Sequence, residues 1–449
     1  MIASCLNSSS DNSLVAQSNQ HKFAFTFVDL FAGIGGFRIP LEALGGRCVA
    51  YSEVDRDALS VYRANFPLAT KSEYEIDMGD IRFSSQRIIP SDIVVGGLPC
   101  QPWSVAGRWG GMQDSRGTLW FEAIRFVAIN QPKAFIFENV PNLSSTTHQS
   151  SWSTILKELS ATGYAIHTDV LNTANFGLPQ DRSRLFIIGI RHDIPNRWKF
   201  QFPHPHLPRQ TLGELLHQEL LLQDLKITEN HQLTLFANSS ISSNYYKGYF
   251  LFSDVRHSSY TIHSWDIIPT LEREKKICLT ILRNRRKKFH SAKDGKPLPF
   301  SLLLRLIPDL EIQELDQLID KNILKFIPGK GYEFKNSKQS VGINGIYRIV
   351  LPTSTIFPTI TASDNADFIA TKSLSKYSDS SNYKQIFLEE IYYPKNYRRI
   401  ADQDAKKLQG FPSWFQTHSS KVKAKKQFGN AVSIPVIYHI AKALLDIIF

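Results

Sequence analysis

Between residues 23 and 191 the chain alternates short apolar runs, rich in β-branched and aromatic residues, with longer stretches whose apolar positions recur about every 3.6 residues. The short runs predict buried strands and the longer stretches predict helices packed against them. Strands are expected within FAFTFVDLF, RCVAYSEV, DIVVGG, KAFIFENV and RLFIIGIR, and helices within GGFRIPLEAL, RDALSVYRANF, TLWFEAIRFVAIN and SWSTILKELSATG. This alternation predicts a doubly wound α/β lobe with a parallel sheet and crossover helices.

After Arg191 the alternation stops, and a more polar and charged region follows. At its centre, TLEREKKICLTILRNRRKKFH predicts a helix with a dense basic face. Next come LPFSLLLRLI, DLEIQELDQLIDKNI and LKFIPGKGYEFK, of which the last predicts a hairpin through Gly329 and Gly331. Three helices and a hairpin in this order suggest a small winged-helix-like insert. The alternative is a solvated helix with scattered basic residues.

The chain ends in QFGNAVSIPVIYHIAKALLDIIF, an apolar helix pattern preceded by a glycine loop. A helix this apolar is expected to pack back onto the first lobe. We therefore expect four segments: a disordered tail over 1–22, the α/β lobe over 23–191, a variable region over 192–385, and a C-terminal segment over 386–449.

Composition narrows the class of protein. The formal net charge of +11 makes a polyanionic partner such as nucleic acid plausible, although many basic proteins bind none. The four cysteines lie far apart without CxxC spacing, which indicates neither a zinc site nor a disulfide framework and fits a reducing cytosol. No secretory signal pattern and no apolar run of roughly 18 residues is present, so a cytoplasmic protein is expected.

The first strand leads into a glycine-rich turn, FVDLFAGIGGFR, before the first helix. Glycines there allow a ligand to approach the backbone closely, although a tight turn without a ligand would look the same. Glu53 ends the next strand, where related folds place an acid on ribose hydroxyls, and Asp80 could accept a hydrogen bond from an exocyclic amine. Because the glycine spacing is not G-x-G-x-x-G, S-adenosylmethionine fits better than NAD.

Cys100 directly follows the strand DIVV, between Pro99 and Pro102, and a polar glycine-rich loop, SVAGRWGGMQDSRG, comes after it. A lone cysteine is usually a small buried hydrophobe. Here the prolines restrict its backbone and the loop is unsuited to a core. The arrangement suggests a nucleophile beside a mobile lid.

A glutamate and two arginines follow further strands of the expected sheet. Glu138 closes KAFIFENV, where burial of its charge requires a partner or a function. Arg182 and Arg184 are two residues apart, so both point the same way if the segment is extended. They could be ordinary surface arginines, but their position at the start of an apolar strand favours binding of an anion or a carbonyl.

These motifs resemble the DNA (cytosine-5) methyltransferase family. They occur in the family's order as FVDLFAGIGGFR, GDI, GGLPCQPWS, ENV, QDRSRLF, PTITA and QFGNAVSIPV, with LQGFP before the last. The resemblance covers residues 23–191 and about 345–449 and leaves a variable target-recognition region between them. It implies a Rossmann-like, S-adenosylmethionine-dependent methyltransferase lobe with a smaller target-recognition lobe.

The resemblance also implies roles for individual residues. Cys100 corresponds to the nucleophile, Glu138 to the acid that engages the cytosine ring nitrogen, and Arg182 and Arg184 to the pair that holds the base and the catalytic loop. Phe31 would stack on the adenine of S-adenosylmethionine, with Glu53 on the ribose and Asp80 on the adenine amine. The remaining cofactor wall would be formed by Gly33, Ile34, Gly35, Gly36, Leu119, Asn430 and Val432.

The family resemblance implies a bacterial restriction-modification enzyme that methylates cytosine in double-stranded DNA, acts as a monomer and has a cognate endonuclease as functional partner. A related enzyme acting on transfer RNA, a catalytically inert DNA-binding regulator and a nicotinamide-dependent oxidoreductase are the alternatives.

The sequence departs from the family in two places. The family often has an arginine a few residues before PTITA, whereas in this sequence the nearest preceding arginine is Arg348. In QDRSR, Asp181 falls at a variable position and could pair with a neighbouring arginine.

Overall fold

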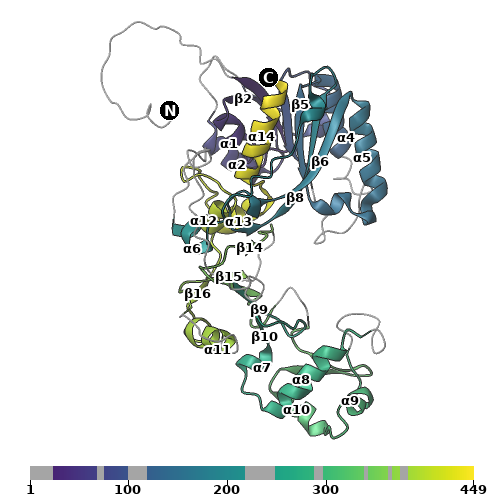
Figure 1. Cartoon of the computed structure of the whole chain (residues 1–449), viewed down its shortest axis with the longest axis vertical. Coiled ribbons are helices and arrows are strands. Elements are labelled where there is room, and N and C mark those ends of the chain that lie inside the picture. Colours follow the sequence, from purple (N-terminus) through teal and green to yellow (C-terminus); the bar gives the residue numbers. More distant parts are fainter. Residues whose placement is uncertain are drawn as a thin grey trace, which may run out of the picture.

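The computed structural model describes residues 24–67, 75–99, 119–217, 248–287, 297–337, 342–362, 367–374 and 383–449. Figure 1 shows an elongated molecule with a larger lobe around a long sheet and a smaller lobe at the opposite end. A shorter sheet and the segments around it connect the two lobes. The expected tail over 1–22 lies outside the described residues.

The larger lobe is built on a seven-stranded sheet with the order β3-β2-β1-β4-β5-β8-β6. Its strands are β1 Phe25–Leu30, β2 Gly46–Ser52, β3 Ile76–Asp77, β4 Ile93–Gly97, β5 Ala134–Asn139, β6 Tyr164–Asn172 and β8 Ser183–Arg191. Strands β1 to β5 pair in parallel. All five expected strands are present, and the Rossmann-like fold is confirmed.

One detail of the expected sheet is wrong, because β8 runs antiparallel to both of its neighbours, β5 and β6. Only residues 173–182 connect β6 to β8. A parallel connection needs a crossover of a dozen or more residues, usually a helix, so this short link forces a hairpin-like return. Strand β6, the partner in that return, was not expected from the sequence.

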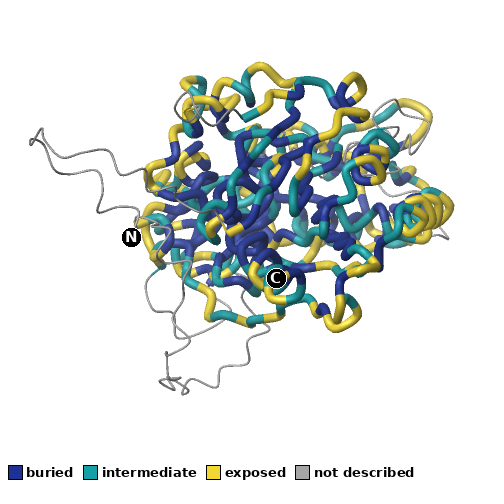
Figure 2. The backbone as a smooth tube through the Cα atoms, turned by 90° about the horizontal axis from the view of Figure 1, so that it is seen from above, coloured by how far each residue is buried: buried dark blue, intermediate teal, exposed yellow. Residues whose placement is uncertain are grey.

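Helices cover both faces of this sheet. The expected helices are found as α1 Arg38–Ala43, α2 Arg56–Asn65, α4 Leu119–Asn130 and α5 Gln149–Ala161, and a short α3 spans Ile81–Ser84. In β5, Phe135 and Phe137 point to the apolar cluster that contains α4 and α5, while Ala134 and Ile136 point to the cluster on the other face. The strands are thus buried at the centre of the lobe, with the exposed positions around them (Figure 2).

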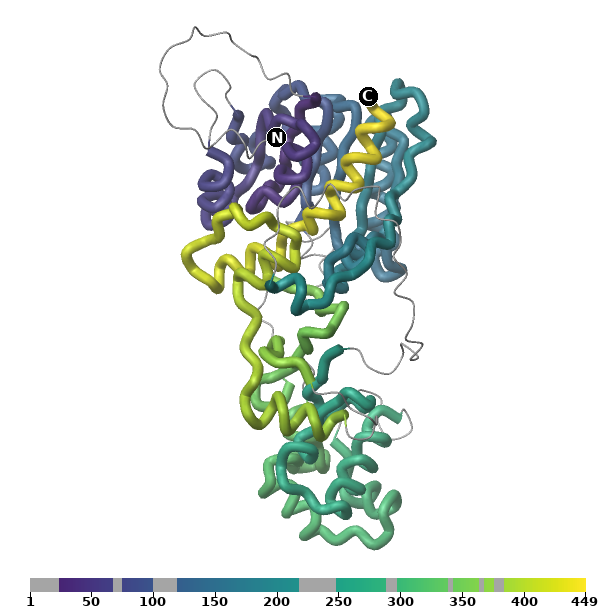
Figure 3. The backbone as a smooth tube through the Cα atoms, turned by 60° about the vertical axis from the view of Figure 1, so that its left-hand side comes forward, coloured from purple at the N-terminus to yellow at the C-terminus, as the bar shows by residue number. Residues whose placement is uncertain are grey.

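The last helix, α14 Ile434–Ile448, packs against α1 on the larger lobe (Figures 1 and 3). Its buried side chains belong to the same apolar cluster as β1 and β2. Among the described residues, one helical stretch, Lys421–Ile448, is long and apolar enough to cross a membrane, but 61% of its most apolar window is buried inside the protein. Burial against α1 accounts for that apolar character, as in other core helices.

The segments between the lobes carry a five-stranded sheet with the order β10-β9-β13-β15-β16. Its apolar core includes Phe250, whose ring stacks on that of Phe387 at 3.8 Å between centroids. The strands are β9 Tyr249–Phe252, β10 Thr261–Ile262, β13 Arg348–Val350, β15 Asp367–Ala370 and β16 Tyr397–Arg399, and α11 Tyr383–Phe387 with a π-helical turn over Leu388–Tyr392 packs on them.

The expected order of three helices and a hairpin is present in the smaller lobe. It consists of α8 Glu272–Asn284, α9 Phe300–Leu306, α10 Ile312–Asp320, β11 Leu324–Ile327 and β12 Gly331–Phe334, preceded by a short α7 at Ser264–Ile267. These elements share their own apolar cluster, separate from those of the sheets. We call α8 to β12 the insert.

Four further short elements bring distant segments to the larger lobe. They are α6 Leu212–His217, β14 Phe357–Pro358, α12 Asp402–Leu408 and α13 Lys421–Asn430. Strand β14 pairs in parallel with β7 Gln180–Asp181. In Figure 1, α12 and α13 lie at the edge of the seven-stranded sheet that faces the smaller lobe.

Candidate active site

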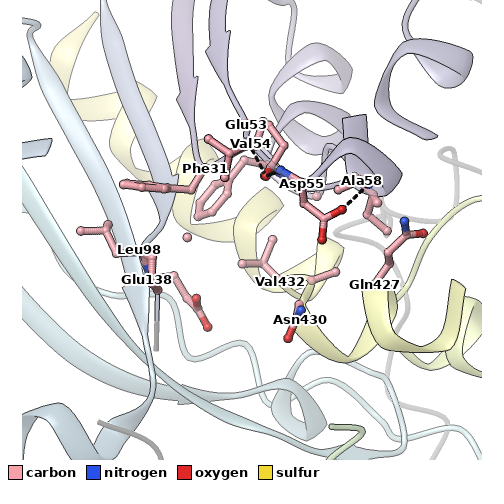
Figure 4. Close-up of a pocket in the computed structure, with 18 of the residues that line it drawn as sticks. Phe31, Glu53, Val54, Asp55, Ala58, Leu98, Glu138, Gln427, Asn430 and Val432 are labelled. Carbon is pink, nitrogen blue, oxygen red and sulfur yellow. Dashed lines mark hydrogen bonds between the residues drawn. The ribbon is translucent and has the colours of Figure 1, made fainter. Parts of the chain in front are cut away.

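A pocket of about 470 Å³ lies at the carboxyl ends of the parallel strands, where open α/β folds place their ligands. Figure 4 shows Glu138 and Leu98 on one side of it, Asp55 on the other, and Asn430 and Val432 along a third wall. The pocket is lined by most of the site residues expected from the sequence, namely Phe31, Gly33, Ile34, Gly36, Glu53, Asp80, Leu119, Glu138, Arg182, Arg184, Asn430 and Val432.

Two expected site residues are not among those lining the pocket. Cys100 lies outside the described residues, although Pro99, directly before it, is part of the pocket wall. Gly35 has a φ of +88°, and a Cβ atom there would lie 2.3 Å from the ring of Phe66. Glycine at 35 is therefore required by packing against Phe66, the residue that follows α2.

The glycine turn fixes the position of Glu53. The Gly33 amide donates a hydrogen bond of 2.7 Å to Glu53 Oε2. Glu53 Oε1 accepts two more, each of 2.7 Å, from the amides of Val54 and Asp55. Phe31, with a φ of +55°, begins the turn in a conformation that non-glycine residues adopt only when the surroundings hold them.

The far side of the pocket carries further carboxylates. Asp80 caps α3 by accepting a hydrogen bond from the Arg82 amide, and it also pairs with the Arg82 guanidinium at 2.5 Å. Hydrogen bonding to Arg82 holds the pKa of Asp80 below its usual value, so Asp80 stays ionised at neutral pH. Asp55 caps α2 through the amides of Asp57 and Ala58. Four carboxylates therefore line this part: Glu53, Asp55, Asp57 and Asp80.

Glu138 lies at the other end of the pocket, at the end of β5. It is only 7% exposed and pairs with Arg184, with 2.8 Å between Oε1 and Nε. Burial raises the pKa of Glu138 above its usual value, and the nearby charges of Arg184 and Arg182 offset only part of that effect. Burial therefore favours the protonated form of this carboxyl group.

The neighbouring Asn139 anchors the segment that leads to Cys100. Its side-chain amide donates to the carbonyl oxygen of Leu98 at 3.3 Å, and the Leu98 amide donates to the Glu138 carbonyl oxygen at 3.2 Å. These hydrogen bonds join the ends of β4 and β5, so that Pro99 and Glu138 line the same pocket.

Arg182 and Arg184 have different surroundings although both line the pocket. Arg182 is 1% exposed, and its guanidinium donates to the carbonyl oxygens of Ile360 at 2.9 Å, Gly429 at 3.1 Å and Ala431 at 2.7 Å. It thereby joins β7 and β8 to the PTITA segment and to the loop after α13. Arg182 thus holds the part of the pocket wall that contains Asn430 and Val432, whereas Arg184 contacts Glu138.

Asp181 and Arg348, the residues at the two departures from the family pattern, each make local contacts. Asp181 accepts a hydrogen bond of 2.7 Å from the side chain of Asn172. Arg348 lies in β13 and pairs with Asp367 of β15 through two contacts of 2.9 and 3.1 Å. Arg348 therefore stabilises the five-stranded sheet and is not one of the residues that line the pocket.

Sequence reasoning expected Asn430, the last residue of α13, at the pocket but missed the contribution of the preceding turns of this helix. Lys423, Lys426 and Gln427 line the pocket, and the Lys423 ammonium pairs with Asp57 at 2.9 Å. This pair spans 366 positions of sequence. The only indication was the basic run KVKAKK directly before QFGN.

No group of three or more potential metal ligands occurs among the described residues.

The family model described as C-5 cytosine-specific DNA methylase matches residues 25–446. The Type II methyltransferase M.HgiBI of Herpetosiphon aurantiacus is 40% identical over 427 residues, which cover 94% of this chain and 96% of the relative. M.HgiCII, a Type II methyltransferase of the same organism, is 41% identical with the same coverage.

Solved structures agree at the level of fold. The Entamoeba histolytica methyltransferase EhMeth and a Spodoptera frugiperda DNMT2 mutant each align with a TM-score of 0.50, at 15% and 16% identity. Both alignments cover 94% of this chain, and 98% and 99% of the respective relatives. From the match over residues 25–446 and the full-length relatives at 40% identity, the chain belongs to the C-5 cytosine-specific DNA methylase family.

Proposed function

We propose that this DNA cytosine-5 methyltransferase uses Cys100, Glu138 and Arg184 to act on a cytosine that has been flipped out of a specific duplex sequence. The observation that supports this most directly is the pair of Glu138 and Arg184, which lines the same pocket as Pro99, the residue before Cys100. The carbon-5 position of a stacked cytosine is out of reach of such a pocket, so the base must leave the helix.

The carboxylate end of the pocket suits S-adenosylmethionine. Phe31 offers an aromatic ring for the adenine, Glu53 an acceptor for the ribose, and Asp80 an acceptor for the adenine amine. The cofactor, when bound, supplies a methyl group carried on a positively charged sulfur. Nearby carboxylates favour such a cation and disfavour a pyrophosphate, and the Gly33 amide already donates to Glu53.

The remaining chemistry is assigned to the chain's own side chains. Carbon 5 of cytosine is a weak nucleophile until a thiolate adds to carbon 6 and ring nitrogen 3 receives a proton or a strong hydrogen bond. We assign the thiolate to Cys100 and the proton to Glu138, while Arg184 orients the Glu138 carboxyl group. After carbon 5 is methylated, water takes the remaining proton from carbon 5, and the bond between carbon 6 and sulfur breaks with its electron pair returning to sulfur. Ring nitrogen 3 returns its proton to Glu138, and Cys100 is released as the thiolate.

Residues 192–385 are assigned to recognition of the DNA sequence, because reading a duplex requires a dedicated surface. In a restriction-modification system the methyl group would protect host DNA from a cognate endonuclease with the same target. We expect the enzyme to act as a monomer in the cytoplasm, where its DNA substrate lies.

The proposal is tested by incubating the purified protein with unmethylated plasmid DNA and S-adenosylmethionine, followed by bisulfite sequencing. We expect 5-methylcytosine at one fixed position of a short recurring sequence. Transfer RNA is offered in a parallel reaction as the competing substrate. Methylation of transfer RNA alone would overturn the proposal, and so would sequence-specific DNA binding without S-adenosylmethionine binding, which would indicate an inert regulator.

A further inference from the structure

The exposed charges at the C-terminal end of α8 and those on α10 have opposite signs. In α8 the side chains of Ile277, Cys278 and Ile281 are buried in the insert's core. Arg283 lies on the exposed side of the last turn, and Lys287, four positions further along, is also exposed. Neither forms an ion pair with another described residue. We call Arg283 and Lys287 the basic end of α8.

Helix α10 carries the opposite charge. Its buried residues Leu315 and Leu318 face the core, and its exposed positions include Glu311, Asp316 and Asp320. Between Asp309 and Asp320 the sequence holds five acidic residues and no basic one.

The cations that do approach α10 are on the side where it meets α8. Arg273 of α8 pairs with Glu314 at 2.8 Å and with Asp309 at 3.0 Å. Lys321, just after α10, pairs with the buried Glu274 of α8 at 2.6 Å. These pairs hold the two helices together and leave the outer face of α10 negative.

The position of α10 in the insert makes this charge informative. It is the third helix and directly precedes the hairpin, the place of the recognition helix in three-helix DNA-binding folds. A face that carries acidic side chains is repelled by the phosphates that border the major groove. Figure 1 also shows α10 at the end of the molecule farthest from the seven-stranded sheet, with α8 on the nearer side.

We propose that the insert binds the phosphate backbone of the DNA substrate through the basic end of α8, with α10 turned away from the duplex. This inference rests on the proposed function, since it takes duplex DNA as the substrate. The insert then adds affinity without reading bases, and sequence recognition is left to the rest of residues 192–385. Binding of phosphates by Arg283 and Lys287 releases counterions, so it must appear in the salt dependence of affinity.

The experiment compares two double variants with the wild-type full-length protein. Arg283→Gln with Lys287→Gln removes the basic end, and Asp316→Asn with Asp320→Asn is the matched control on α10. All four side chains are exposed, so neither variant should disturb the fold. The probe is a fluorescein-labelled DNA duplex of about 30 base pairs and arbitrary sequence, and affinity is measured by anisotropy over a range of salt concentrations.

We expect the basic-end variant to bind more weakly, with a slope of log K against log salt that is shallower by about 1.8, which is two contacts at about 0.9 each. The α10 variant should keep the wild-type slope and affinity within twofold. A wild-type slope in the basic-end variant would overturn the proposal. A marked change of affinity in the α10 variant would also overturn it, because α10 would then lie at the DNA.

A second readout separates phosphate binding from base reading. Bisulfite sequencing of plasmid DNA methylated at low salt should give the same methylated positions for wild type and the basic-end variant. New or lost positions would mean that the insert reads bases, and would contradict the inference. If the basic-end variant has the shallower salt slope but wild type methylates no cytosine, the proposed function fails while the inference about DNA contact stands.

Discussion

Glu138 could be predicted as a site residue because a glutamate that closes an apolar strand needs a partner. Its partner could not be predicted. Arg184 was expected to bind an anion or a carbonyl, and in the structure it pairs with Glu138 itself. That pairing depends on β8 running antiparallel beside β5, so that Leu185 lies opposite Asn139 and Phe186 opposite Glu138. The periodicity of single strands contains no information about this arrangement.

Replacing Glu138 by glutamine tests its role as a proton donor. Because burial raises its pKa, Glu138 keeps its proton to a higher pH than an ordinary glutamate, and both the protonated fraction and the associated stability fall as pH rises through that pKa. We expect Glu138→Gln to lower kcat by about 10²- to 10⁴-fold. The wild-type rate should decline as pH rises, whereas the residual rate of the variant should not show this decline.

The measurement is methyl transfer to DNA as a function of pH, with Glu122→Gln as the control. Glu122 is a glutamate of α4 that does not line the pocket, and it pairs with Arg125. If Glu138→Gln has the kcat of wild type, or the same pH profile as wild type, then Glu138 takes no part in the proton transfer.

Arg182 illustrates a different limit of residue-level reasoning. Its spacing from Arg184 suggested a shared role, yet Arg182 donates to three backbone carbonyl oxygens from segments about 180 and 250 positions away. We expect Arg182→Lys to lower the free energy of unfolding by about 2–3 kcal/mol, since an ammonium group cannot reach all three acceptors. Weaker S-adenosylmethionine binding should follow, because Asn430 and Val432 lie on the segment that Arg182 holds.

Denaturant unfolding and calorimetric titration with S-adenosylmethionine measure these two effects. Arg184→Lys is the comparison. It should affect kcat more than stability, because the Arg184 guanidinium bonds, within the described part of the chain, to Glu138 and to the carbonyl oxygen of the neighbouring Ser183. Equal losses of stability in the two variants would contradict the distinction between them.

At the scale of elements, five strands and four helices of residues 23–191 followed from apolar periodicity because each is locally encoded. The hairpin-like return of β6 and β8 did not, because it depends on the length of a connection. Likewise, the glycine of QFGN was expected to open a loop, whereas Gly429 lies in α13 at a close contact. A Cβ atom there would lie 2.4 Å from the backbone carbonyl carbon of Thr361.

Gly429→Ala should therefore force α13 away from the segment at Thr361. We expect a loss of about 1–3 kcal/mol in the free energy of unfolding, the usual effect of overpacking. Gly97→Ala is the matched control for stability, since its nearest contact would be an ordinary 3.7 Å. The measurement is thermal unfolding. If both variants have the melting temperature of wild type, the contact between α13 and this segment can adjust without loss of stability, which would contradict the prediction.

At the scale of the whole molecule, the ordered motifs and the basic variable region allowed the two-lobed methyltransferase fold to be predicted. The return of α14 to α1 followed from its apolar character. The pocket as a whole could not be predicted, because its walls join residues from Phe31 to Val432, including the pair of Asp57 and Lys423. Contacts over such separations are set by how the C-terminal segment folds back, which no local pattern encodes.

The central claim is that Cys100 attacks a cytosine in DNA. The most direct measurement is incorporation of labelled methyl groups from S-adenosylmethionine into duplex DNA by wild type and Cys100→Ala, with Cys278→Ala as the control. Cys278 is buried in the core of the insert, away from the pocket. We predict 5-methylcytosine with wild type and with Cys278→Ala, and no incorporation with Cys100→Ala although it still binds S-adenosylmethionine. Equal incorporation by wild type and Cys100→Ala would contradict the account.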